Sequence, residues 1–189
     1  MAATVLIREY NGAAPGTPTD KTSGTVRFKN ADDASVDLAN PLVVPAAGQE
    51  YSYEKFLRLS ASGDYTQISN LVLYTDGAPG FIAGSPTEVD VFYAVTGSYR
   101  APAIPDEGSD PPQSDLVGSP VENMSNLFAA VSGSPIDMDG INTGPFTPTS
   151  PTADQQEIGD FVALVMQVKP GATAGITNAE TITFGYDEI

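Results

Sequence analysis

The chain of 189 residues contains no cysteine, no histidine and no tryptophan. Without cysteine, disulfide bonds and thiolate metal sites are excluded. Without histidine, the commonest general base and the commonest zinc ligand are both missing. Catalysis would have to depend on carboxylates, tyrosine or lysine, and the chain carries no Gly-rich phosphate loop, nucleophile elbow or dinucleotide fingerprint. The sequence therefore predicts a protein that is not an enzyme, has no catalytic residues and needs no cofactor.

Basic side chains are scarce, with 8 against 24 acidic ones and a formal net charge of −16. Such a chain should repel phosphate backbones and anionic lipid surfaces, so we expect neither nucleic acid nor membrane as a partner. No apolar run is long enough for a membrane helix, and the N-terminus lacks the features of a signal peptide, which predicts a soluble protein made in the cytoplasm. A protein partner would be neutral to basic, although solubility alone also explains the acidity.

One apolar run, residues 160–169, carries neither glycine nor proline in a chain that has 18 Gly and 16 Pro. Both of its alternating faces are apolar, which is typical of a strand that is covered on both sides. A buried helix is the alternative. The β-branched and aromatic residues of the run, and Pro170-Gly171 directly after it, favour a central strand.

Further runs with alternating apolar residues predict strands at 3–10, 24–30, 51–60, 68–74, 88–96 and 180–186. In the run 24–30, Val26 and Phe28 should face the core while Arg27 and Lys29 face solvent. Seven or eight such strands predict an all-β fold, an antiparallel β-sandwich of jelly-roll or immunoglobulin-like type. The length fits one domain over residues 1–189.

Residues 97–157 are dense in Pro, Gly, Ser and Asp, and only 125–132 resembles a strand or short helix. Such a long loop is uncommon inside a compact domain, so it contains unrecognised short strands or is a functional arm, and we favour the arm. Its acidic segment with Asp106, Glu107 and Asp110 has polyproline character. We expect this segment to bind Arg27 and Lys29 of a neighbouring copy, with a mobile surface loop as the alternative.

Asp137, Asp139 and Asn142 place oxygen ligands at alternating positions beside Gly140, as in loops that bind calcium. The later bidentate glutamate of such loops is missing, and Asx-Gly clusters are also ordinary turn chemistry, so a weak calcium site and a solvated turn are both open. The eight tyrosines could stack on sugars, as in a carbohydrate-binding module, or could line the core, which we favour.

Three stretches resemble virion structural proteins of tailed bacteriophages: NPLVVPAAGQEYSYEKFLRL at 40–59, ISNLVLYTDG at 68–77 and ETITFGYDEI at 180–189. The resemblance implies a small β-rich auxiliary protein that decorates or cements the capsid shell, located in the virion after assembly in the host cytoplasm. Its partners would be the major capsid protein or other virion proteins, and it would occur as a homo-oligomer or in many copies on a lattice. A tail, head–tail connector or fibre-associated protein is the alternative that this resemblance leaves open.

Overall fold

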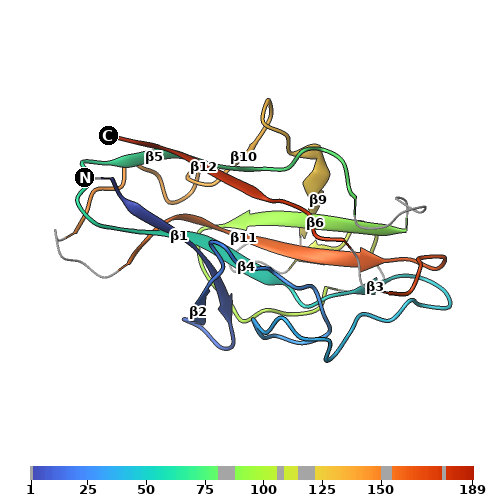
Figure 1. Cartoon of the computed structure of the whole chain (residues 1–189). Coiled ribbons are helices and arrows are strands. Elements are labelled where there is room, and N and C mark those ends of the chain that lie inside the picture. The colour runs from blue at the N-terminus through green and yellow to red at the C-terminus, as the bar shows by residue number, and fades with distance from the viewer. Residues whose placement is uncertain (1, 81–87, 106–108, 115–121, 150–154, 176–177) are drawn as a thin grey trace.

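The computed structural model describes residues 2–80, 88–105, 109–114, 122–149, 155–175 and 178–189. Within these segments the chain is built of β-strands and one short 3-10 helix (Figure 1). The elements are β1 (Thr4–Asn11), β2 (Thr17–Asp20), β3 (Glu50–Tyr51), β4 (Lys55–Ser62), β5 (Ile68–Tyr74), β6 (Val89–Thr96), β7 (Gln113–Ser114), β8 (Glu122–Asn123), β9 (Ser125–Asn126), η1 (Leu127–Ala129), β10 (Ile136–Asp137), β11 (Gln156–Val168) and β12 (Thr183–Glu188).

The larger sheet has the strand order β2-β1-β4-β11-β6-β9, with β3 pairing at the end of β11, and every pair in it is antiparallel. Strand β11 lies in its centre, between β4 and β6, and every residue from Ile158 to Val168 is buried. The predicted central strand is therefore confirmed. Its apolar side chains lie on both faces because both faces of this sheet are covered.

A smaller antiparallel sheet, β10-β5-β12, packs over one face of the larger sheet. Leu57, Leu59, Val162 and Leu164 of the larger sheet form one core cluster with Leu71 and other residues of the smaller sheet. Two antiparallel sheets packed face to face are a β-sandwich, so the predicted fold class is confirmed. The choice between the jelly-roll and immunoglobulin types stays a prediction.

The opposite face of the larger sheet carries an aromatic cluster. The Phe161 ring meets the rings of Tyr10 and Phe56 edge to face, and Tyr99 packs onto all three. The Arg100 guanidinium lies over the Phe56 ring, 5.5 Å from its centroid. Coil after β6 thus covers this face, so strand β4 is buried on both sides although one of its faces is mostly polar in sequence.

Residues 97–157 are not one continuous arm. They include β7 to β10 and η1, and β9 and β10 extend the larger and smaller sheets respectively. Leu127, Phe128 and Met138 are buried in the sandwich core. The expectation of a single long excursion missed these elements because strands of two residues are too short to show an alternating pattern.

The predicted strand at 24–30 is wrong, since these residues pair with no strand. Val26 and Phe28 do pack against the core as expected. The alternation in this run therefore reflects packing of an extended segment onto the sandwich, which produces the same pattern as a strand without any ladder of hydrogen bonds.

Gly159 sits in the irregular part of β11, where the register with β4 shifts between Ile158 and Val162. Its φ is +68°, and a Cβ there would lie 2.5 Å from the Met138 carbonyl oxygen. We expect Gly159→Ala to lower the free energy of unfolding by about 2 to 5 kcal/mol, because left-handed strain adds to overpacking against backbone. Urea unfolding measures this loss.

Gly48→Ala is the matched control, because Gly48 has a φ of +72° but no atom within 4 Å of the point where a Cβ would lie. Only the left-handed strain applies there, so its loss should be about 1 to 2 kcal/mol. Equal losses at the two positions would show that a Cβ at position 159 and the Met138 carbonyl oxygen can move apart without lowering the free energy of unfolding.

Candidate functional site

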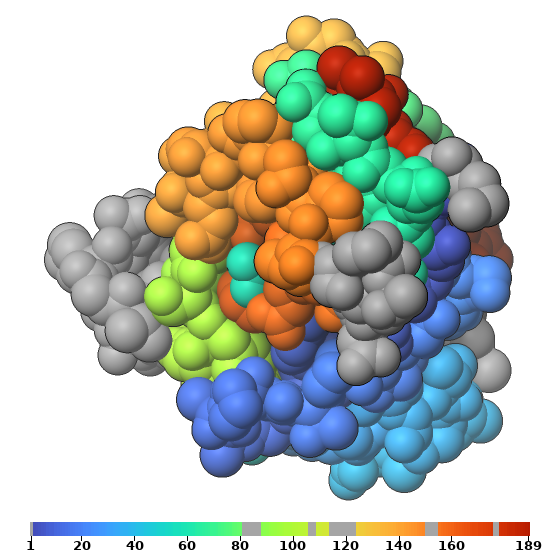
Figure 2. All heavy atoms as spheres, turned by 90° about the vertical axis from the view of Figure 1, so that its left-hand side faces the viewer, coloured from blue at the N-terminus to red at the C-terminus, as the bar shows by residue number. Residues whose placement is uncertain are grey.

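A long connection, residues 21–49, joins β2 to β3 and contains no helix or strand, although the structure describes all of it. We call it the 21–49 loop. Long connections of this kind inside a compact domain are uncommon and are usually functional. Figure 2 shows residues of this part of the chain gathered along the lower side of the molecule, with the C-terminal strand at the upper side.

The inner side of the 21–49 loop is apolar. Val26, Phe28, Leu42 and Val44 are half-buried and pack against the main core cluster. Two backbone bonds hold neighbouring parts of the loop in place, from Asn30 N to the Asn40 carbonyl at 2.8 Å and from Tyr53 N to the Lys29 carbonyl at 3.1 Å. The loop is therefore a packed layer of the sandwich.

A buried ion cluster lies beneath the loop. Glu9 on β1 is fully buried, and its carboxylate meets Lys55 Nζ of β4 at 3.4 Å and Lys21 Nζ of the loop at 3.3 Å. Strand register explains the contact between Glu9 and Lys55. Glu9 pairs with Leu57, and Lys55 lies two residues before Leu57 on the same face of β4. No sequence pattern indicates this cluster, since its three members are far apart in the chain.

The two buried lysines also hold loop carbonyls. Lys55 Nζ donates to the Asp33 carbonyl at 2.8 Å, and Lys21 Nζ donates to the Ala34 carbonyl at 2.6 Å and to that of Thr25 at 3.0 Å. A buried ammonium group is tolerated only where its donors are satisfied. The same bonds that satisfy the lysines therefore fix the path of the loop backbone.

A third lysine holds the loop from within. Lys29 is 1 % exposed, and its Nζ lies 2.6 Å from Asp33 Oδ1 and 3.2 Å from Asp37 Oδ1. Desolvation would lower the pKa of Lys29, but the hydrogen bonds that Lys29 donates to Asp33 and Asp37 outweigh it and raise that pKa. The bond from Lys29 lowers the pKa of Asp33 in turn. Desolvation prevails at Lys55, whose pKa is lowered despite the nearby Glu9.

The outer side of the loop exposes large apolar side chains. Val36 is 57 % exposed, Leu38 64 % and Val43 65 %. We call these three residues the apolar patch. All three lie within eight residues of the 21–49 loop, and exposed aliphatic side chains on one segment mark an interaction surface more strongly than the same residues scattered singly. The sequence shows three apolar residues between Pro41 and Pro45 but not which of them face outward.

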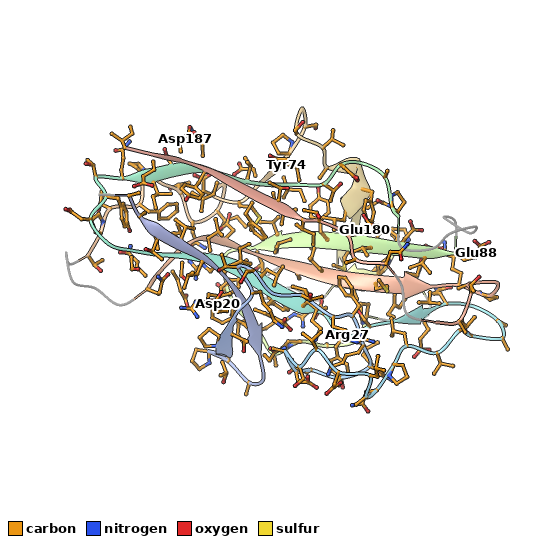
Figure 3. The ribbon with its side chains drawn as sticks, viewed as in Figure 1. Asp20, Arg27, Tyr74, Glu88, Glu180 and Asp187 are labelled. Atoms are coloured by element: carbon orange, nitrogen blue, oxygen red, sulfur yellow. The ribbon has the colours of Figure 1, made fainter. Side chains whose placement is uncertain are left out.

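Of the predicted interface residues, the structure describes Arg27, Lys29 and Asp110. Lys29 is buried rather than solvent-facing, because Asp33 and Asp37 fold over it, so its charge is not presented to a neighbour. Arg27 is half-buried in the loop on the lower side of the molecule, opposite Asp187 (Figure 3). Asp110 binds Lys169 at 3.1 Å and Gln167 at 3.1 Å, and these bonds lower its pKa. Asp106 and Glu107 lie outside the described residues.

The predicted calcium residues are only partly brought together. Asp137 Oδ1 accepts the Asp139 amide at 2.9 Å, which is an Asx turn. Asn142 instead donates its side-chain amide to the Gly97 carbonyl at 2.9 Å, while its backbone amide binds buried Asp160 at 2.7 Å. Within the described segments, no three acidic side chains lie close enough together to hold a metal ion. The geometry therefore supports a structured turn.

Three of the eight tyrosines are buried and four are half-buried, so most of them pack at least partly into the protein. All eight are described, and only Tyr186 is more than a third exposed, at 39 %. Tyr10, Tyr51 and Tyr99 direct their hydroxyls to Glu157, the Ser109 carbonyl and the Gly12 carbonyl. Tyr186 lies where the pairing of β12 with β5 is irregular, between Gly185 and Asp187. No exposed row of tyrosines forms a sugar-stacking surface.

We expect Glu9→Gln to lower the free energy of unfolding by about 3 to 5 kcal/mol, because two buried ammonium groups would lose their shared carboxylate. Urea unfolding at neutral pH measures this change. Glu157→Gln is the control, since Glu157 pairs with Arg58 at 2.7 Å but its side chain is 47 % exposed. Its loss should stay near 1 kcal/mol or below. Similar losses in the two variants would mean that the Glu9 cluster is not holding the loop.

Asp137→Asn should stabilise the protein at pH 7 by a few tenths of a kcal/mol to about 1 kcal/mol. Desolvation and the neighbouring Asp137 raise the pKa of Asp139, so the folded state disfavours two ionised carboxylates and loses stability as pH rises through that pKa. The asparagine keeps the turn acceptor and removes the repulsion. The gain should shrink as pH falls below the raised pKa of Asp139, because that carboxyl is then neutral and no longer repels its neighbour.

The same variant tests the calcium alternative when thermal unfolding is followed with millimolar calcium and with a chelator. Both proteins should respond to calcium alike. A calcium-dependent rise in the melting temperature of the wild type that Asp137→Asn abolishes would instead support a bound ion.

Among the described residues, no helix has the length and apolar character needed to cross a membrane. Comparison with protein-family models, with curated proteins and with solved structures finds no match to this chain.

Proposed function

We propose that this chain is a non-catalytic virion structural protein that binds the outer shell of a tailed bacteriophage as a decoration or cement protein. The observation that carries the proposal is the apolar patch, in which Val36, Leu38 and Val43 are exposed on a loop held from beneath by buried ions. The sequence resemblance described above points to the same class of protein.

Rigidity of the 21–49 loop supports a role in protein contact. A surface that is ordered before binding loses little conformational entropy on association, so the apolar area that it buries contributes more fully to affinity. Three aliphatic side chains that are each more than half exposed suit another protein surface better than a small ligand, since small ligands bind in concave sites that bury most of their surface. Weak contacts of this kind multiply when many copies bind one symmetric lattice.

Two other proposals are less well supported. A carbohydrate-binding module would expose several tyrosines, whereas Tyr186 is the one exposed tyrosine. A carboxylate-based enzyme would need two acidic groups across a cleft, whereas the acidic pair Asp137 and Asp139 lies in a turn. A tail, head–tail connector or fibre-associated position within the particle remains the second proposal from the resemblance.

Sedimentation of the purified protein with mature, undecorated capsids tests the proposal. We expect co-sedimentation at a fixed ratio to capsid subunits, while the protein alone stays in the supernatant. Higher salt should weaken binding if carboxylates contribute to the contact.

Albumin at equal concentration controls for trapping in the pellet. Absence of binding, together with self-assembly into rings or trimers, would reject the decoration role and favour a tail, connector or fibre position.

A further inference from the structure

Nearly all basic side chains of the protein are used internally. Of the eight, six form ion pairs with carboxylates of the same chain, namely Lys21, Lys29, Lys55, Arg58, Arg100 and Lys169. Arg8 donates to Ser60 at 3.3 Å. In the part of the chain that the structure describes, Arg27 alone makes neither an ion pair nor a hydrogen bond through its side chain. The outer surface therefore has almost no positive charge to offer a partner.

Two carboxylates lie close to the apolar patch in sequence, because Asp33 precedes Val36 and Asp37 stands between Val36 and Leu38. Asp33 and Asp37 each use Oδ1 to bind Lys29 and the backbone amide two residues further on, at 2.8 Å from Ser35 and 3.0 Å from Ala39. Their side chains are nevertheless 42 % and 51 % exposed. Each carboxylate is thus held in a fixed position and remains accessible to a second cation.

A second copy of this chain does not fit such a surface. Two apolar patches brought together would place Asp33 and Asp37 against the same carboxylates of the other copy, and a net charge of −16 adds repulsion over a longer range. Like charges brought together at an interface oppose association and so disfavour this pairing.

We propose that Val36, Leu38 and Val43, together with the Asp33 and Asp37 carboxylates, form the contact surface for a protein face that has an apolar centre and lysine or arginine at its rim. The apolar residues supply the area that is removed from water, and the two fixed carboxylates supply orientation and a faster encounter. This inference deepens the proposed function and rests on it for the identity of the partner, but the chemistry of the surface can be tested separately.

The test compares two chromatography resins as defined probes. One resin carries a plain quaternary ammonium group, and the other carries the same group with a benzyl ring attached. The wild type should elute at clearly higher salt from the benzyl resin, because the patch and its carboxylates bind both parts of the ligand. The variant Val36→Ser/Leu38→Ser/Val43→Ser should lose at least half of this difference.

A second test variant removes the two carboxylates, and two control variants make the same kinds of substitution at other places on the surface. Ile141→Ser/Ile189→Ser removes aliphatic side chains that are 59 % and 71 % exposed elsewhere, and it should elute as the wild type does. Asp33→Asn/Asp37→Asn keeps the Oδ1 acceptors for Lys29 and should elute at lower salt from both resins. Asp76→Asn/Asp187→Asn removes equal charge elsewhere and should shift elution less. Circular dichroism melting checks that each variant is folded.

Equal retention differences in the wild type and the patch variant would overturn the inference. A concentration-dependent dimer that the patch variant abolishes would also overturn it, because the occupant would then be a second copy. With capsids, the patch variant should bind at least tenfold more weakly while Ile141→Ser/Ile189→Ser binds normally. If the wild type does not bind capsids, the proposed function fails and the resins alone decide the inference.

Discussion

The meeting of Glu9 with Lys55 and Lys21 is the interaction on which the lower side of the molecule depends. It joins β1, β4 and the 21–49 loop at a fully buried point, where a charge is tolerated only with partners on several sides. A buried ion cluster is weak evidence for net stability, because hydrophobic residues of equal volume can be as good or better. Its contribution here is one conformation of a loop that has no strand or helix to define it.

Strand pairing alone would leave that loop free to move, because residues 21–49 extend neither sheet. Apolar packing by Val26, Phe28, Leu42 and Val44 fixes its distance from the core, and the lysine bonds to carbonyls fix its path. The two effects are complementary, since apolar contacts have no direction and hydrogen bonds do. Together they allow Val36, Leu38 and Val43 to stay exposed without the loop collapsing onto the sandwich.

The sequence predicted features that depend on local pattern and missed those that depend on distant partners. The run at 160–169 was recognisable because both faces of a central strand are apolar. The segment 24–30 misled because packing of Val26 and Phe28 on a core gives the same alternation as a strand. Burial of Lys29 could have been suspected from Asp33, four residues later, and from Asp37, whereas nothing in the sequence links Glu9 to Lys55. Exposure of the patch required the three-dimensional structure.

The two ends of the described chain lie together, on the left-hand side of Figure 1, where the Ala3 amide donates to Glu188 Oε1 at 2.6 Å. The 21–49 loop reaches the lower right of the same view, at a distance from them. A fluorescent protein or an antigen fused to either end would therefore project away from the patch. If the proposed contact through the 21–49 loop holds, such cargo would lie on the side of the protein that faces away from its partner.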